Sequence, residues 1–152
     1  MASIVSARRC SRRMILLSAF LLLGACASGP SSRLKTLGTP SGSGPIQLEV
    51  KNGTSAIVNN LFLAKSADVD RAGREAFHDD SPEQAALWGR DLLVKSALEV
   101  GGSVRVPVPG PGRFDVRAVA RDGREQHVGS LGLRAGGRYV LELGEGGWRP
   151  AQ

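Results

Sequence analysis

The sequence predicts an all-β protein: an antiparallel β-sandwich of six or seven strands with one short helix in an inserted loop. Apolar and polar residues alternate over several short segments between Ile46 and Leu143, which is the pattern of half-buried strands. Glycine-containing turn pairs separate these segments at intervals of roughly ten residues, as in a sandwich. The alternation is absent from residues 66–98, so the helix is predicted there.

The first strand is predicted over residues 46–51, where apolar and polar residues alternate. Its inward residues are Ile46, Leu48 and Val50. Asn52-Gly53 then predicts a type I′ hairpin turn, because both residues tolerate positive φ. The return strand, 57–64, is apolar on both faces, which indicates either a central strand or a strand with a bulge at Asn59-Asn60.

Within the insertion, a short helix is predicted from Pro82 to about Trp88. Ser81 is a preferred N-cap residue, Pro82 suits the first helical position, and Gln84 completes a capping box. The indole of Trp88 is predicted to be buried and to close one end of the sandwich, beside Leu92 and Leu93.

The insertion also carries acids at part of the spacing of an EF-hand loop. The residues concerned are Asp68, Asp70, Gly73 and Asp79. Ala72 stands where a calcium ligand is needed, and no helix pattern precedes Asp68, so an EF-hand is not expected. A looser calcium site stays open as an alternative. No cofactor and no structural metal are predicted.

The C-terminal half predicts four further strands. They cover 104–108, 114–121, 127–133 and 139–143, with turns at Asp122-Gly123 and Gly136-Gly137. Pro107 cannot donate a backbone hydrogen bond, which favours an edge position for the first of them. Arginines alternate with apolar residues on these strands, and Arg117 and Arg121 are therefore candidate interaction residues on a solvent-facing sheet surface.

The N-terminus has the organisation of an export signal. Four arginines precede an apolar run, Met14 to Leu23, that is too short to remain as a transmembrane helix. The run ends in Leu23-Gly24-Ala25-Cys26, which resembles the lipobox of bacterial lipoproteins. That resemblance implies a signal peptide over 1–25 and acylation of Cys26, with chains such as palmitate. Ser11-Arg12-Arg13 also resembles a twin-arginine motif, so the export route stays open between the two systems.

Residues 26–44 are predicted to be the acylated cysteine and a flexible linker, because serine, glycine and proline dominate them. The sandwich domain is predicted over 45–149. Ala27 is not an aspartate, and by the sorting rule of enterobacterial lipoproteins this implies residence in the outer membrane, on its periplasmic face. Cys10 lies in the signal, so no disulfide is expected in the mature domain.

Charge and composition narrow the function. The chain has 20 basic and 14 acidic residues and a net charge of +6, but four arginines belong to the signal, and nucleic-acid binding is therefore not predicted. The mature domain carries His78 and His127 but lacks a nucleophile elbow or a glycine-rich phosphate loop. An enzyme is not expected.

A set of short segments forms a further pattern across the domain. They are Asn59-Asn60, Trp88-Gly89-Arg90-Asp91-Leu92-Leu93, Gly101-Gly102, Phe114-Asp115-Val116-Arg117-Ala118-Val119 and Asp122-Gly123. Together they resemble a group of small exported bacterial β-rich domains. A second resemblance, to the transthyretin-like outer-membrane lipoprotein of type VI secretion systems, rests on the lipobox and the Asp-Leu-Leu segment. Both imply an Ig-like or transthyretin-like sandwich.

The function expected from these observations is a non-catalytic lipoprotein that acts as an interaction or structural module of the cell envelope. The membrane is its first partner, through the lipid anchor, and an envelope protein or a glycan is the second. The alternative is a component of a secretion system of the type VI kind. Besides Cys26, the candidate interaction residues are Trp88, Asp91, Arg117 and Arg121.

Overall fold

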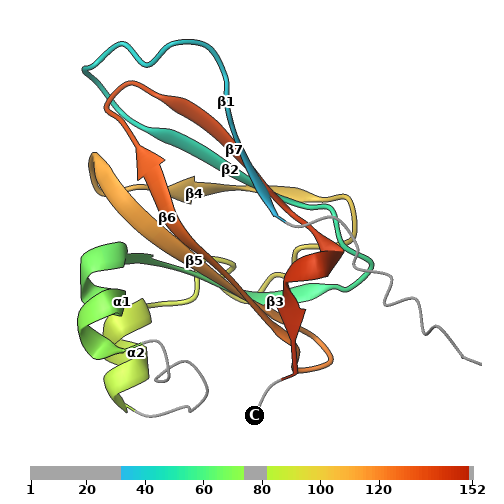
Figure 1. Cartoon of the computed structure of the whole chain (residues 1–152). Helices are drawn as coiled ribbons and strands as arrows, with labels where there is room; N and C mark the ends of the chain where they lie inside the picture. Colours follow the sequence, from blue (N-terminus) through green and yellow to red (C-terminus); the bar gives the residue numbers. More distant parts are fainter. Residues whose placement is uncertain (1–31, 74–81, 151–152) are drawn as a thin grey trace, which may run out of the picture.

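The computed structural model describes residues 32–73 and 82–150, and its strands form two four-stranded sheets (Figure 1). The first sheet has the order β1 (Arg33–Thr36), β7 (Arg138–Leu143), β2 (Gln47–Asn52) and β4 (Ser103–Pro107). The second has the order β3 (Val58–Lys65), β5 (Gly112–Ala120), β6 (Glu125–Leu133) and β8 (Trp148–Arg149). Every strand pair is antiparallel except β2 with β7. The predicted all-β sandwich is confirmed, with eight strands described.

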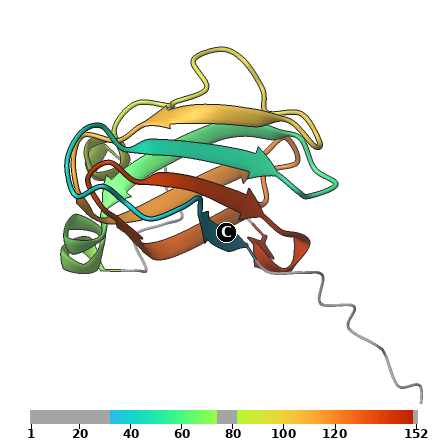
Figure 2. The same cartoon turned by 90° about the horizontal axis from the view of Figure 1, so that it is seen from above.

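The core lies between the two sheets, whose strands overlie one another in Figure 2. Alternate residues of each strand point inward, because successive side chains of a strand leave on opposite faces. The fully buried members include Leu48, Val50, Val116, Ala118 and Leu141. The inward faces predicted for these strands are therefore correct.

The predicted hairpin at Asn52-Gly53 is wrong. β2 pairs with β4 and β7, whereas β3 belongs to the second sheet, so residues 53–57 carry the chain from one sheet to the other. The side chain of Asn52 is fully buried: its amide donates to the carbonyls of Ala56 and Leu98, and its oxygen accepts from Thr54. The local bonds to Thr54 and Ala56, together with the long-range bond to Leu98, hold a sheet-to-sheet crossing in place of a two-residue turn.

The sequence of β3 is apolar on both faces because each face packs against a different apolar cluster. Leu61 and Leu63 pack into the core between the sheets, whereas Phe62 and Ala64 pack on the outer side. The register shift between Val58 and Asn60 is the predicted bulge. β3 is nevertheless the last strand of its sheet, and its outer edge is hydrogen-bonded at two points by the loop of residues 92–98.

Two short helices cover the outer face of the second sheet. α2 (Pro82–Trp88) has the predicted bounds. α1 (Ser66–Ala72) was not predicted; it follows β3 without a side-chain cap, so capping signals do not reveal it. Asp68 and Asp70 lie within α1 rather than in a calcium loop, and Asp79 lies outside the described residues.

The flexible linker is a wrong prediction for the part that the structure describes. Residues 33–36 form β1, which pairs with β7, and the chain beyond is bonded to the β6–β7 turn by Gly42 and Gly44. Leu34 packs against the core, which gives β1 a reason to dock despite its polar neighbours. Residues 26–31, with Cys26, lie outside the described part. No helix among the described residues is long and apolar enough to cross a membrane.

Candidate functional site

Polar side chains gather in two regions of the sandwich. One is the helix-covered face, the outer side of the second sheet beneath α1 and α2, which holds Asp115 and His127. The other is the Ser32 end, defined here as Ser32 with the turn 53–57, the hairpin 121–124 and the 3₁₀ turn η2 (Glu145–Gly147) with β8. In Figure 1 the helices lie on the left and the Ser32 end lies on the right.

Asp115 is the centre of the helix-covered face. Its side chain points outward from β5, yet the residue is 2% exposed because the start of α1 lies over it. The hydroxyl of Ser66 donates to Oδ1 at 2.5 Å, and the backbone N–H of Ser130 donates to the same oxygen at 2.8 Å. His127 Nε2 lies 2.7 Å from Oδ2. Ser130 reaches this position with a φ of 58°, next to a register shift in the β5–β6 pair.

These contacts decide the charge of Asp115. Burial alone raises the pKa of its carboxyl, but the hydrogen bonds from Ser66, Ser130 and His127 lower that pKa by more. The net pKa is below the ordinary value, so the carboxylate is charged at neutral pH. A buried charge with this set of donors joins α1, β5 and β6 to one another.

Serine, aspartate and histidine meet here, but not in the order that nucleophilic catalysis needs. The hydroxyl of Ser66 directs its proton to Asp115 rather than to an imidazole, whereas a catalytic serine is hydrogen-bonded to the histidine. A hollow of about 390 Å³ lies beside Ser66 and Ser130, with Lys65 and Arg113 in its wall. Among residues 32–73 and 82–150, no group of three or more His, Cys, Asp or Glu could hold a metal ion.

Trp88 is buried, as predicted, but it does not close an end of the core. The residue is 2% exposed and packs with Ala64 and Val69 in a separate small cluster on the helix-covered face. Its ring meets that of His127 edge-on, at 5.8 Å between centroids. The indole therefore connects α2 to His127, the partner of Asp115, and it is too buried in this structure for a binding partner to reach it.

Asp91 holds the loop after α2 against β3. Its carboxylate accepts hydrogen bonds from the backbone N–H of Leu61 at 2.9 Å and of Leu93 at 3.1 Å, and from the amide of Asn60 at 3.0 Å. The Trp-Gly-Arg-Asp-Leu-Leu segment thus contains two residues with structural roles, one apolar and one polar.

Arg117 and Arg121, which the sequence groups together, differ in the structure. Arg117 is 9% exposed, donates two hydrogen bonds to Glu125 at 3.0 and 2.5 Å, and lies over the ring of Phe62. Arg121 is exposed at the start of the β5–β6 hairpin and makes no ion pair within the described chain. Of the two, Arg121 is the one that a ligand can reach.

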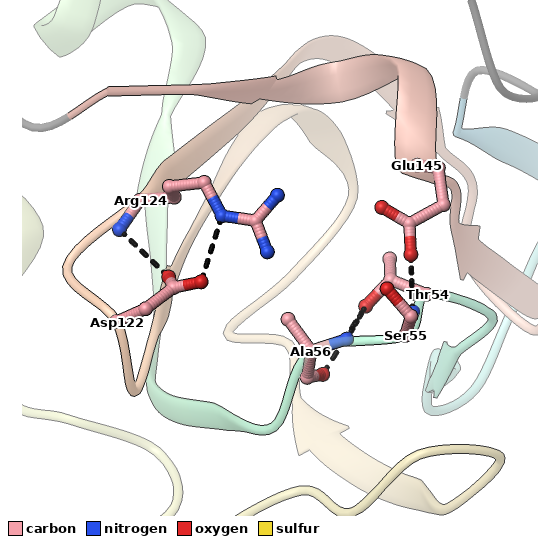
Figure 3. A network of polar contacts seen from close by, with 6 residues as sticks. All are labelled: Thr54, Ser55, Ala56, Asp122, Arg124 and Glu145. Carbon is pink, nitrogen blue, oxygen red and sulfur yellow. Dashed lines mark hydrogen bonds and ion pairs between the residues drawn. The ribbon is translucent and has the colours of Figure 1, made fainter. Parts of the chain in front are cut away.

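At the Ser32 end, the carboxylates are occupied by groups of the protein itself (Figure 3). Asp122 accepts from the backbone N–H of Arg124 at 3.1 Å and from Arg124 Nε at 2.8 Å, and these bonds lower its pKa. Glu145 accepts from the backbone N–H of Ser55, and hydrogen bonding to Ser55 lowers its pKa as well. The guanidinium of Arg124 also lies 5.6 Å from the ring centre of Trp148.

A hollow of about 500 Å³ lies between the turn after β2 and the β5–β6 hairpin. Its lining residues are Ser55, Ala56, Ile57, Arg121, Asp122 and Arg124. Sequence reasoning found the hairpin through Asp122-Gly123 but missed Ser55 and Glu145, because their contact joins residues far apart in the chain. It missed the roles of Ser66, Asp115 and Ser130 for the same reason.

Comparisons of the chain with protein-family models, with curated proteins and with solved structures find no match.

Proposed function

We propose that the protein is a non-catalytic lipoprotein, anchored through Cys26 to the periplasmic face of the outer membrane, where it acts as an interaction module of the cell envelope. The observation that supports this most is the position of β1, which begins at Arg33 and leaves residues 27–32 between the strand and Cys26. An extended chain of that length spans about 20 Å at most. An acyl group on Cys26 therefore keeps the sandwich next to the membrane.

The two outer faces of the sandwich support a role in binding a partner. α1 and α2 cover the second sheet, and among the described residues their main contacts are with β3 and β5 rather than with strands of the first sheet. The outer side of the first sheet, the open face, carries the exposed Arg105 and Arg138, with Glu49 and Val140 between them, around a hollow of about 450 Å³. An envelope protein or a glycan is the proposed occupant, because the face combines charges of both signs with an apolar residue.

The anchor is tested by replacing the cysteine. Cys26→Ser is expected to abolish incorporation of labelled palmitate and to leave unprocessed precursor or soluble protein. Cys10→Ser is the matched control, since Cys10 lies within the predicted signal and its loss should leave labelling and processing unchanged. A Cys26→Ser variant that is still labelled and processed contradicts the lipoprotein assignment.

Residence in the outer membrane has its own test. Density-gradient fractionation is expected to find the wild-type protein in outer-membrane fractions and an Ala27→Asp variant in inner-membrane fractions. Wild-type protein found only in the inner membrane would contradict the proposed outer-membrane location, but it would remain consistent with a lipid anchor on Cys26.

The open face is tested by charge reversal. Arg105→Glu with Arg138→Glu should remove species that crosslink to the protein in intact envelopes. Arg113→Glu, at an exposed position outside this face, should leave them in place. Crosslinking that survives the double reversal would move the partner surface elsewhere.

A further inference from the structure

The Ser32 end is the part of the sandwich nearest to the proposed anchor. Ser32 is fixed there, because its hydroxyl donates to Gln126 at 2.8 Å and accepts from the N–H of Gly144 at 3.1 Å. Residues 27–32 give a reach of about 20 Å. β5 alone is nine residues long, about 30 Å of strand, so the anchor cannot hold the sandwich upright with its opposite end against the membrane.

The hollow at this end presents guanidinium groups. The backbone N–H of Arg121 donates to the carbonyl of Ile57 at 2.8 Å, which holds the hairpin beside the turn after β2. Arg124 is oriented by Asp122 and by Trp148, and it uses Nε for the carboxylate. Figure 3 shows its two terminal nitrogens directed away from Asp122, toward the side where Ser55 and Glu145 lie. Donors placed in this way suit an oxyanion.

The charges at this end favour an external anion. Asp122 and Glu145 already accept hydrogen bonds from Arg124 and Ser55. Arg121 and Arg149 are exposed and form no ion pair with any residue that the structure describes. Arg121, Arg124 and Arg149 carry three positive charges against the two negative charges of Asp122 and Glu145, which leaves a small local surplus of positive charge.

Resting on the proposed lipid anchor, we propose that the Ser32 end docks on the membrane and that Arg121 and Arg124 bind the phosphate of an anionic phospholipid headgroup. The ligand chemistry is a phosphodiester, and the bilayer is its source. Because the anchor keeps the hollow close to the bilayer surface, headgroups are present there at a high effective concentration. Each arginine near an anionic surface strengthens the contact by roughly fivefold. The contact would orient the sandwich on the membrane instead of leaving it to rotate on its tether.

The test uses the full acylated protein, purified in detergent and inserted into vesicles of phosphatidylcholine, with or without phosphatidylglycerol. Backbone amide exchange is measured for the hairpin 121–124 and the turn 53–57. We expect exchange to slow when phosphatidylglycerol is present, and Arg121→Gln to reduce the effect by roughly fivefold. Arg121→Gln with Arg124→Gln should abolish it. The single variant keeps the bond between Arg124 and Asp122, so it tests the contact in an undisturbed hairpin.

The matched control is Arg113→Gln with Arg134→Gln, two exposed arginines beside a hollow at the opposite end of the sandwich. This variant should retain the lipid-dependent protection. Inorganic phosphate added to phosphatidylcholine vesicles is a second control, and equal protection by it would overturn the membrane as the source of the anion.

Failure of this inference can be told apart from failure of the anchor. Protein that floats with phosphatidylcholine vesicles but shows the same exchange with and without phosphatidylglycerol overturns the headgroup site and leaves the anchor intact. Protein that does not float with phosphatidylcholine vesicles overturns both proposals.

Discussion

The helix-covered face and the Ser32 end use the same chemistry in opposite settings. Each has an aspartate beside a basic side chain: Asp115 with His127 at 2.7 Å, and Asp122 with Arg124 at 2.8 Å. The side chain of Asp115 is 3% exposed, whereas that of Asp122 is 51% exposed. The first pair lies between helices and sheet, and the second lies in solvent at the tip of a hairpin.

This difference in exposure indicates which polar side chains stabilise the fold and which can bind a ligand. A buried carboxylate that loses its partners leaves uncompensated polar groups in a region of low dielectric, so its contacts are costly to break. An exposed pair contributes little to stability because water and salt screen it. Polar groups of the helix-covered face are therefore expected to stabilise the fold, whereas the exposed arginines of the Ser32 end, Arg121 and Arg149, are accessible to ligands.

The largest expected loss of stability comes from replacing one of the two tryptophans, Trp88. Trp88→Ala should lower the free energy of unfolding by about 3–5 kcal/mol, because it empties a buried site beneath α2. A domain of this kind has about 5–15 kcal/mol in total, so the melting temperature should fall by many degrees. Thermal melts followed by circular dichroism measure it.

Trp148→Ala is the matched control at the Ser32 end. Trp148 is half-buried and packs against the edge of the core, so a smaller loss of about 1–2 kcal/mol is expected. If Trp88→Ala and Trp148→Ala lost the same free energy of unfolding, the helix-covered face would not be the more important of the two regions for stability.

The two aspartates give the next effect. Asp115→Asn keeps the shape of the side chain but removes its charge, and about 2–3 kcal/mol of stability should be lost as the contacts with His127 and Ser130 weaken. Asp122→Asn should change the stability by less than about 0.5 kcal/mol. Urea unfolding of both variants measures the difference, and a large loss for Asp122→Asn would refute the role given to exposure.

How far the sequence predicts the molecule depends on the range of each interaction. Strands with a period of two, such as β5 and β7, were predicted because the pattern is local, and so was α2, whose predicted N-cap residue Ser81 lies outside the described residues. β1 was missed because four residues without strong β propensity dock only against a strand more than 100 residues away. The hairpin at Asn52-Gly53 failed because long-range bonds from Asn52 override a local turn preference.

The candidate site follows the same rule. Trp88, Asp91, Arg117 and Arg121 were all named from the sequence, but their burial was predicted only for Trp88. The alternation that groups Arg117 with Arg121 cannot show that Glu125 pairs with the first and leaves the second exposed. Asp115 carries no local signal, since its partners come from α1 and from β6.

Those two arginines provide a third matched pair. Arg117→Gln should cost about 2 kcal/mol, because it leaves Glu125 unpaired at a nearly buried position and removes the contact with Phe62. Arg121→Gln should change the stability by less than about 0.5 kcal/mol. Chemical denaturation of the two variants under the same conditions measures both losses of stability. Similar losses would show that burial and ion pairing do not determine how much each arginine contributes.

The smallest expected effect is a dependence on pH that originates from the helix-covered face. The pKa of Asp115 is lowered in the folded protein, so its contribution is present above the unfolded pKa of about 3.9 and is lost as the pH falls through the folded value. The pKa values of Asp122, Glu142 and Glu145 are lowered as well, but their side chains lie at the surface, where screening weakens the linkage. Unfolding free energies measured from pH 6 down to about pH 2.5 should therefore fall less steeply for Asp115→Asn than for the wild-type protein, by at most about one proton in the slope. Asp122→Asn should follow the wild-type curve closely. If Asp122→Asn reduced the fall of the unfolding free energy at low pH as much as Asp115→Asn does, surface carboxylates would cause the acid sensitivity. The contrast between the buried Asp115 cluster and the Ser32 end would then be wrong.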